Sequence, residues 1–170
     1  MPLEIMIKVS LTYAEELEAH QAGFERAKAL KATANHASRY DKGLNYHSFI
    51  AQLAEAVGSE IAVARYFGLF DFMPTHNTFK RQADVAQRIE VKWTRWKDGH
   101  LVVHKSDRDT DIAVLGVGQS PDYYLAGWLP VESAKSKRYW VESERNWWVG
   151  QSNLNPMEDF LESKYADISL

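Results

Sequence analysis

The residues with the clearest capacity for chemistry are an aspartate, a glutamate and a lysine that lie close together in the chain. Asp84 precedes Glu90 with five residues between them, and Lys92 follows two positions later. Residues 88–95 have the composition of a β-strand, in which successive side chains point to opposite faces. Glu90 and Lys92 therefore project to one face, and the apolar side chains between them project to the other. This pattern predicts a strand with one packed face and one charged face.

The position of Asp84 depends on the length of the turn before this strand. A three-residue turn over residues 86–88 pairs Val85 with Ile89 and brings Asp84 opposite Glu90, with about 5 Å between their Cβ atoms. A two-residue turn shifts this register and separates the two acids. Two carboxylates at that distance repel each other unless a cation lies between them. A hard divalent cation with oxygen ligands is the natural occupant.

A third acid is expected from a helix over residues 46–67. In helical projection Glu60 falls on the apolar face, whereas Glu55 falls among polar residues and is expected at the surface. A carboxylate on a buried face is costly unless it is paired or binds a cation. Two interpretations stay open, namely a metal ligand or a buried ion pair with an arginine such as Arg65 or Arg88.

In this order the motifs resemble the PD-(D/E)XK nuclease superfamily, and most closely its small phage or prophage-type members. The likeness covers residues 52–140, and Ala83 stands where the superfamily often has a proline before the aspartate. Its elements are Ser59-Glu60-Ile61-Ala62-Val63-Ala64, Ala83-Asp84-Val85, Glu90-Val91-Lys92, Gly127-Trp128 and Glu132-Ser133-Ala134.

The resemblance implies an α/β, restriction-endonuclease-like fold with a mixed central β-sheet flanked by helices. It also implies hydrolysis of DNA phosphodiester bonds with Mg²⁺, for which Mn²⁺ substitutes. The implied catalytic residues are Glu60, Asp84, Glu90 and Lys92. The implied metal ligands are Glu60, directly or through water, Asp84, Glu90 and the backbone carbonyl of Val91. Lys92 would orient the attacking water and offset charge in the transition state, with its pKa lowered by the nearby cation.

The elements that position these residues follow from capping and periodicity. Thr12 and Glu15 form a capping-box pattern that begins a long N-terminal helix over residues 13–36, in which Gly23 is the weak point. We expect one domain over residues 1–170, with a helical arm at about 12–43 and a catalytic core at about 45–150. Strands are predicted at residues 79–85, 88–95, 100–104, 112–117 and 123–129, with a hairpin turn at 97–99, a short first strand or extended lead-in at 4–11, and helices at 131–135 and 157–165.

Composition limits the classes of protein. The chain has 170 residues, 45% of them hydrophobic, no cysteine, a net charge of −3 and a pI near 6.1. No thiolate metal site or disulfide is possible, and no apolar run approaches the ~18 residues that span a bilayer. The N-terminus lacks the pattern of a signal peptide. We expect a cytoplasmic protein, in the host cytoplasm if phage-encoded, with no membrane partner and no organic cofactor.

Two basic clusters are candidate contacts to DNA phosphates, or alternatively solvated surface. Tandem tryptophans at 147–148 would stack on bases, or pack in the core or a dimer face. The acidic segment 107–111 mimics the start of a calcium loop but lacks the later ligands, so it is interpreted as a polar turn. The basic clusters comprise Arg26, Lys28, Lys31, Arg39 and Lys42, and then Lys135, Lys137 and Arg138.

Three functional hypotheses remain at this stage. The first is a metal-dependent deoxyribonuclease, endo- or exonuclease, with DNA as partner and possible homodimerisation. Because no base-reading module is evident, its cleavage would not be specific for base sequence. The second is a catalytically inactive protein of the same fold that binds DNA or another protein. The third is an unrelated α/β domain, in which Asp84 and Glu90 would lie on opposite faces.

Overall fold

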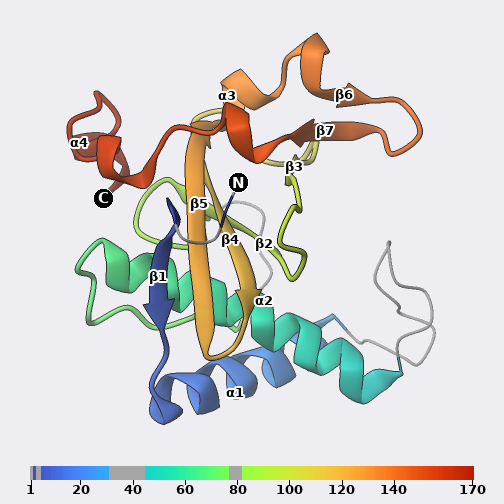
Figure 1. Ribbon diagram of the computed structural model, residues 1–170. Coiled ribbons are helices and arrows are strands. Elements are labelled where there is room, and N and C mark those ends of the chain that lie inside the picture. The colour runs from blue at the N-terminus through green and yellow to red at the C-terminus, as the bar shows by residue number, and fades with distance from the viewer. Residues whose placement is uncertain (1, 3–4, 31–44, 77–81) are drawn as a thin grey trace.

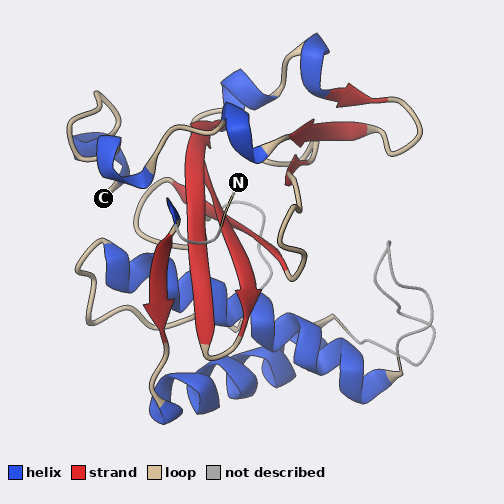
Figure 2. Ribbon diagram, in the orientation of Figure 1, coloured by secondary structure: helices blue, strands red, loops and turns tan. Residues whose placement is uncertain are grey.

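The computed structural model describes residues 2, 5–30, 45–76 and 82–170. In these residues the fold is a mixed α/β arrangement with a four-stranded sheet, a smaller three-stranded sheet, and helices (Figures 1 and 2). The coarse α/β class predicted from the sequence is confirmed. The four-stranded sheet has the order β1-β5-β4-β2, with bounds β1 Ile7–Ser10, β5 Asp122–Pro130, β4 Ile112–Gln119 and β2 Ile89–Thr94.

Strand directions in this sheet are mixed, as predicted. β1 pairs antiparallel with β5, β5 antiparallel with β4, and β4 parallel with β2. β4 is buried on both faces through Val117, which confirms the interpretation of its unbroken apolar run. β2, the strand that carries Glu90 and Lys92, is an edge strand of this sheet and pairs only with β4 in it. The charged side chains of β2 therefore lie beside a buried strand.

Two long helices carry the N-terminal third of the described chain. α1 spans Tyr13–Ala29, and Thr12 and Glu15 form the predicted capping box. α2 spans Tyr46–Tyr66, with the Asn45 side chain accepting from the amide of Ser48. Leu30 caps α1, and residues 31–36 of the predicted first helix lie outside the described residues. Across the described residues, neither these helices nor any other combines the length and apolarity needed to cross a membrane.

The two helices form successive layers on the sheet. α2 packs against β2 and β4, and α1 packs against α2 (Figure 1). Gly23, the weak point of the predicted helix, lies directly against Ala54 of α2. A Cβ atom at Gly23 would lie 2.6 Å from the backbone nitrogen of Ala54. The glycine is therefore a packing requirement, and it fixes how α1 crosses α2.

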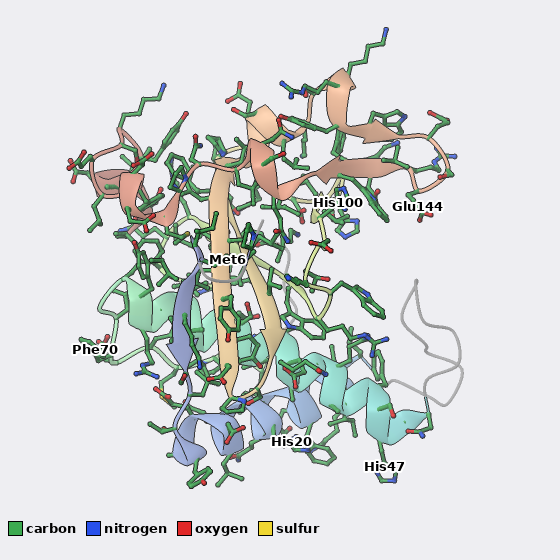
Figure 3. The ribbon with its side chains drawn as sticks, in the orientation of Figure 1. Met6, His20, His47, Phe70, His100 and Glu144 are labelled. Carbon is green, nitrogen blue, oxygen red and sulfur yellow. The ribbon has the colours of Figure 1, made fainter. Side chains whose placement is uncertain are left out.

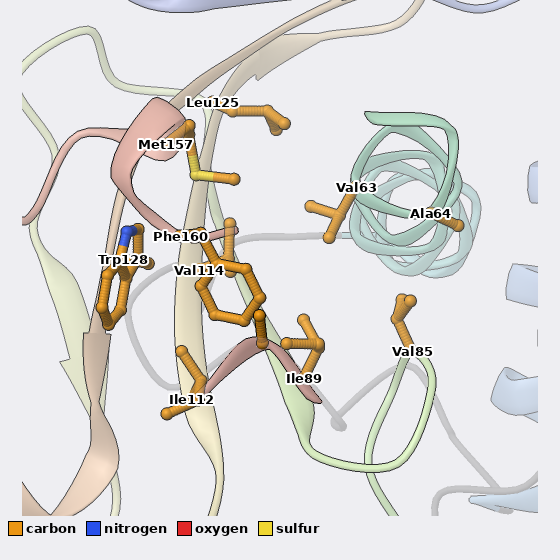
Figure 4. Packing of buried hydrophobic residues seen from close by; sticks show 11 residues of the cluster. Val63, Ala64, Val85, Ile89, Ile112, Val114, Leu125, Trp128, Met157 and Phe160 are labelled. Atoms are coloured by element: carbon orange, nitrogen blue, oxygen red, sulfur yellow. The ribbon is translucent and has the colours of Figure 1, made fainter. Parts of the chain in front are cut away.

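The main core lies between α2 and the sheet. Figure 4 shows Val63 of α2 pointing toward the sheet, where Ile89 of β2 and Phe160 of the C-terminal segment belong to the same cluster. Phe160 meets Trp128 of β5 edge-on, with 5.2 Å between ring centroids. The last residues of the chain thus close the core that supports β2.

The C-terminal segment is not the single helix predicted over residues 157–165. It forms a 3₁₀ turn, η4 (Met157–Asp159), and a short helix, α4 (Ala166–Ser169). The hydroxyl of Ser163 donates to the carbonyl of Phe160 at 2.6 Å and accepts from the amide of Tyr165 at 3.2 Å. Such local side-chain bonds compete with the helical pattern and end it.

The smaller sheet has the order β3-β7-β6, with β3 at Leu101–Val103, β6 at Trp140–Val141 and β7 at Asn146–Val149. The predicted hairpin between β2 and β3 is wrong, because β3 pairs with β7. The side-chain amide of Gln151 donates to the carbonyls of Lys97 and Gly99, so the turn after β2 is tied to the C-terminal part of the chain. The remaining elements are α3 (Val131–Ala134), η2 (Lys137–Tyr139) and η3 (Gln151–Asn153).

Candidate functional site

The turn before β2 has the length on which the position of Asp84 depends. Val85 and Ile89 exchange backbone hydrogen bonds of 3.0 and 3.1 Å, which closes a three-residue turn. Ala86 in this turn adopts a φ of 52°, a left-handed conformation that is uncommon for alanine. The antiparallel pairing places Asp84 opposite Glu90. Of residues 82–85 only Val85 bridges to β2, so the strand predicted there is reduced to a single bridge.

The hairpin fixes Asp84 through the backbone as well. Its Oδ2 accepts a hydrogen bond of 2.8 Å from the amide of Val91. Ile89 is fully buried, and Val91 packs against the same core cluster from the apolar face of β2. Glu90 and Lys92 share the opposite face, and Lys92 Nζ lies 3.2 Å from Glu90 Oε1. The alternation predicted for this strand is confirmed.

Asp107, which lies in the segment predicted to be a polar turn, completes this group of charges. Its Oδ2 lies 2.7 Å from Lys92 Nζ, and its side chain is only 1% exposed. The same oxygen accepts a hydrogen bond of 2.8 Å from the amide of His104. Its other oxygen, Oδ1, is buried and has no hydrogen-bond partner. The sequence offered one signal for this residue, an acidic segment placed directly after a strand.

Glu60 is held by an arginine of α1. Arg26 donates from Nη1 and Nη2 to the two carboxylate oxygens at 2.7 and 2.8 Å, and from Nε to the carbonyl of Thr75 at 2.8 Å. The Glu60 side chain is 5% exposed and that of Arg26 is 11% exposed. Of the two interpretations of Glu60, metal ligand or buried ion pair, the structure shows the buried ion pair. Its partner is Arg26, whereas Arg65 contacts Glu15.

This geometry corrects the placement of Arg26. The sequence placed it with exposed lysines in a phosphate-binding cluster, but its guanidinium lies inside the protein. The crossing at Gly23 sets this direction, because Arg26 follows one turn later on the same face of α1. Burial raises the pKa of Glu60 even though the hydrogen bonds from Arg26 lower it.

Asp84 has the most strongly perturbed ionisation of the hairpin. Burial, followed by the charges of Glu60 and Glu90, raises the pKa of Asp84 to about 8. The amide of Val91 and the ammonium of Lys92 act in the opposite direction. In this arrangement Asp84 carries a proton at neutral pH, and ionised Asp84 requires a further positive charge beside it.

The pKa values of Lys92 and Asp107 are both shifted in the direction that favours the charged form. Burial acts to lower the pKa of Lys92, but Glu90 and Asp107 together raise it above its ordinary value. Burial acts to raise the pKa of Asp107, and Lys92 and the amide of His104 bring it below the ordinary value. The side chains by themselves therefore raise the pKa of Lys92, and the lower pKa expected beside a bound cation stays a prediction.

The three acids expected to bind a metal do not form one compact group. Within the described parts of the chain, no set of three or more histidine, aspartate or glutamate side chains is arranged to hold a metal ion. Figure 3 shows His20 and His47 on the long helices and His100 at the opposite end of the protein. The acids that remain on the hairpin are Asp84 and Glu90, with Glu60 behind them in its pair with Arg26.

The other predicted phosphate contacts are distributed unevenly. Lys28 is exposed and lies 3.2 Å from Glu25. Lys135 is engaged with Asp109 at 2.6 Å, whereas Lys137 and Arg138 are exposed. Lys31, Arg39 and Lys42 lie outside the described residues.

The tryptophans predicted to pack or to stack on bases lie on the smaller sheet. Trp147 packs edge-on against Trp140 across the β6–β7 hairpin, with 4.9 Å between ring centroids. Trp148 packs against His100, with 5.5 Å between centroids. Trp140, Trp147 and Trp148 are half-buried. These contacts favour a packing role for the tryptophans.

No family model matches this chain, and comparison with curated proteins and with solved structures finds no match either. The mixed α/β class is established by the structure itself. Any function must accordingly be argued from the side chains around β2.

Proposed function

We propose that the protein is a metal-dependent deoxyribonuclease of the PD-(D/E)XK type, which hydrolyses DNA phosphodiester bonds with Mg²⁺ or, in its place, Mn²⁺. The observation that carries the proposal is the pairing of Val85 with Ile89, which puts Asp84 opposite Glu90 and beside Lys92. This is the arrangement that the Asp-x₅-Glu-x-Lys spacing predicts. It makes the third hypothesis, with the two acids on opposite faces, the least favoured.

The charges around the hairpin support a divalent cation. Arg26 compensates Glu60 within one bidentate pair. The carboxyl groups of Asp84, Glu90 and Asp107 lie around the ammonium of Lys92, while Arg26 and Arg108 also act electrostatically on Asp84 and Glu90. Burial and the neighbouring Glu60 and Glu90 make the negative charge of ionised Asp84 costly. A divalent cation beside Asp84 and Glu90 balances it.

The donor set also suits Mg²⁺. The donors are the carboxylate oxygens of Asp84 and Glu90 together with the backbone carbonyl of Val91, all of them hard oxygen ligands. Mg²⁺ is commonly held by one or two carboxylates and keeps several waters, so a third direct acid is not required. Glu60 would act through water, because Arg26 occupies both of its oxygens. This revises the direct role that the resemblance allowed for Glu60.

Each residue then has a distinct part in hydrolysis. When bound, a divalent cation would polarise the phosphate and make a water more acidic. Lys92 orients the attacking water and offsets the charge that develops on the phosphoryl oxygens. Asp84 and Glu90 would hold the cation, and β2 is supported by its pairing with the buried strand β4. Exposed Lys28, Lys137 and Arg138 are the described candidates for contact with DNA phosphates.

Replacing Lys92 with alanine tests the assignment of the catalytic lysine. We expect Lys92→Ala to reduce cleavage by about 10²–10³-fold or more, since it removes charge stabilisation that is needed in the transition state. The measurement is a gel assay on plasmid, linear, nicked and single-stranded DNA with Mg²⁺ or Mn²⁺. Lys8→Ala is the matched control, because Lys8 also lies on a strand of this sheet and pairs with an aspartate, Asp122, at 3.2 Å. Cleavage at the wild-type rate by Lys92→Ala would contradict the assignment.

Metal binding is tested separately with Asp84→Asn. Asparagine keeps an oxygen for the amide of Val91 but loses the charged ligand. Titration calorimetry with Mg²⁺ and Mn²⁺ should show weaker binding than for the wild-type protein. Unchanged affinity would mean that the metal binds at another part of the chain.

A second candidate function is a catalytically inactive protein of this fold that binds DNA or a protein partner. The observation in its favour is the bidentate hold of Arg26 on Glu60, which occupies one of the expected acids. The same gel assay separates the two candidates. DNA binding without metal-dependent cleavage of any of the four DNA forms would favour the inactive protein.

A further inference from the structure

Asp107 is a buried carboxylate whose orientation does not depend on Lys92. The amide of Asp107 donates to the carbonyl of His104 at 3.1 Å, and the amide of His104 donates back to Asp107 Oδ2 at 2.8 Å. This reciprocal pair closes the turn after β3 and fixes the carboxylate from its own backbone. Lys92 Nζ then reaches the same oxygen at 2.7 Å. The turn therefore presents a fixed anion to a flexible lysine.

Lys92 has two carboxylate neighbours, Glu90 and Asp107, and only Glu90 is also a proposed metal ligand. Glu90 is the more distant at 3.2 Å and is a metal ligand in the proposed function. When its charge is shared with a cation, its hold on the ammonium weakens, and the cation itself repels Lys92. Asp107 is nearer, is more deeply buried and is not one of the proposed ligands. Asp107 is therefore the group able to hold Lys92 in place when a cation is bound.

We propose that Asp107 is the positioning residue for Lys92, holding its ammonium beside Glu90 while the metal and the DNA phosphate are bound. This inference rests on the proposed nuclease function. Asp107 acts through Lys92 and does not touch the substrate. Its removal should therefore slow the chemical step and leave DNA binding nearly unchanged.

The test compares the steady-state kinetics of Asp107→Asn and of the wild-type protein on DNA with Mg²⁺. Asparagine keeps an oxygen for the amide of His104 and loses the charge that holds Lys92. We expect kcat to fall about 10²-fold, as for a catalytic group displaced by about 1 Å, with KM within about twofold. Asp107→Glu restores the charge at a shifted position, so its kcat should be about tenfold below wild type.

Asp111→Asn is the matched control. Asp111 lies in the same loop, is also buried, and forms an ion pair of 2.7 Å with Arg108. It has no contact with Lys92 among the described interactions, so its loss should lower the melting temperature without lowering kcat. Melting curves for each variant show whether the protein is folded. If Asp107→Asn does not fold, Asp107→Glu carries the test.

The outcomes separate this inference from the function on which it rests. Wild-type kcat in Asp107→Asn, or in Asp107→Glu if only that variant folds, overturns the positioning role and leaves the nuclease in place. A kcat loss in Asp111→Asn equal to that in Asp107→Asn also overturns it, because the effect then belongs to the loop as a whole. No metal-dependent cleavage by the wild-type protein, or full cleavage by Lys92→Ala, removes the proposed function and this inference together.

Discussion

The two groups of buried charges beside α2 and β2 differ in how their charges are matched. In the pair of Arg26 with Glu60, one cation meets one anion, and both carboxylate oxygens are hydrogen-bonded. Around the hairpin, the carboxyl groups of Asp84, Glu90 and Asp107 lie about the ammonium of Lys92, and one oxygen of Asp107 has no hydrogen-bond partner. The matched pair joins α1 to α2. The unmatched group lies at the outer strand of the sheet.

This difference indicates which group is structural and which is functional. A complete buried pair needs nothing more, and breaking it leaves one charge isolated in the interior. An incomplete group is costly in itself, and perturbed ionisation of this kind is common at functional sites. The raised pKa of Asp84, about 8, is the sign of that cost. The comparison therefore predicts opposite effects on stability when a charge is removed from each group.

The largest expected effect comes from breaking the matched pair with Arg26→Met. The carboxylate of Glu60 would remain buried near Asp84 and Glu90 without a partner. We expect the free energy of unfolding to fall by about 3–5 kcal/mol, as for other broken buried pairs. Urea unfolding at pH 7 measures the change. Adding Glu60→Gln should recover a large part of the loss.

A small effect of Arg26→Met, below about 1 kcal/mol, would contradict the structural role of this pair. The same result would show that Glu60 is free to join the hairpin acids. In that case the direct metal role first expected for Glu60 would return.

A smaller effect of opposite sign is expected from the unmatched group. Burial and nearby carboxylates raise the pKa of Asp84 from 3.8 to about 8. Between these values the folded chain holds a proton that the unfolded chain has lost, so stability falls as the pH rises through this window. Asp84→Asn removes that dependence. Its melting temperature should exceed that of the wild type by about 3–8 °C at pH 8.5 and by little at pH 4.

The measurement is thermal melting by circular dichroism across this pH range without divalent metal. Glu55→Gln is the control, since Glu55 accepts hydrogen bonds from Tyr123 and Ser120 away from the hairpin. Equal melting curves for wild type and Asp84→Asn at pH 8.5 would mean that Asp84 carries no unfavourable charge in the folded protein.

The parts of this site that were predictable from the sequence are the local ones. The alternation of Glu90 and Lys92 needs only a strand, and the place of Asp84 needs only the length of one turn. The beginnings of α1 and α2 follow from local capping, since the Thr12 and Asn45 side chains accept hydrogen bonds from backbone amides three residues later. In each case the cause lies within a few residues of the effect.

The residues that sequence reasoning missed depend on long-range packing. Arg26 meets Glu60 across 34 positions, at a crossing set by the contact of Gly23 with Ala54. Asp107 reaches Lys92 because β3 leaves β2 and joins β7, whereas the sequence predicted a hairpin of β2 with β3. Neither pairing leaves a periodic pattern in the chain. Glu60 and Lys92 were identified from the sequence, but their partners Arg26 and Asp107 were not.

The smallest effect on stability is expected at Lys28, an exposed lysine two residues after the buried Arg26. It lies 3.2 Å from Glu25 with 56% of its side chain exposed, and such surface pairs contribute less than about 0.5 kcal/mol. Lys28→Ala should therefore unfold in urea almost as the wild type does. If this face of α1 contacts DNA, the variant should lower the slope of log affinity against log salt concentration by about one. Fluorescence anisotropy with labelled DNA at several salt concentrations measures that slope, and an unchanged slope would place the phosphate contacts of the protein elsewhere.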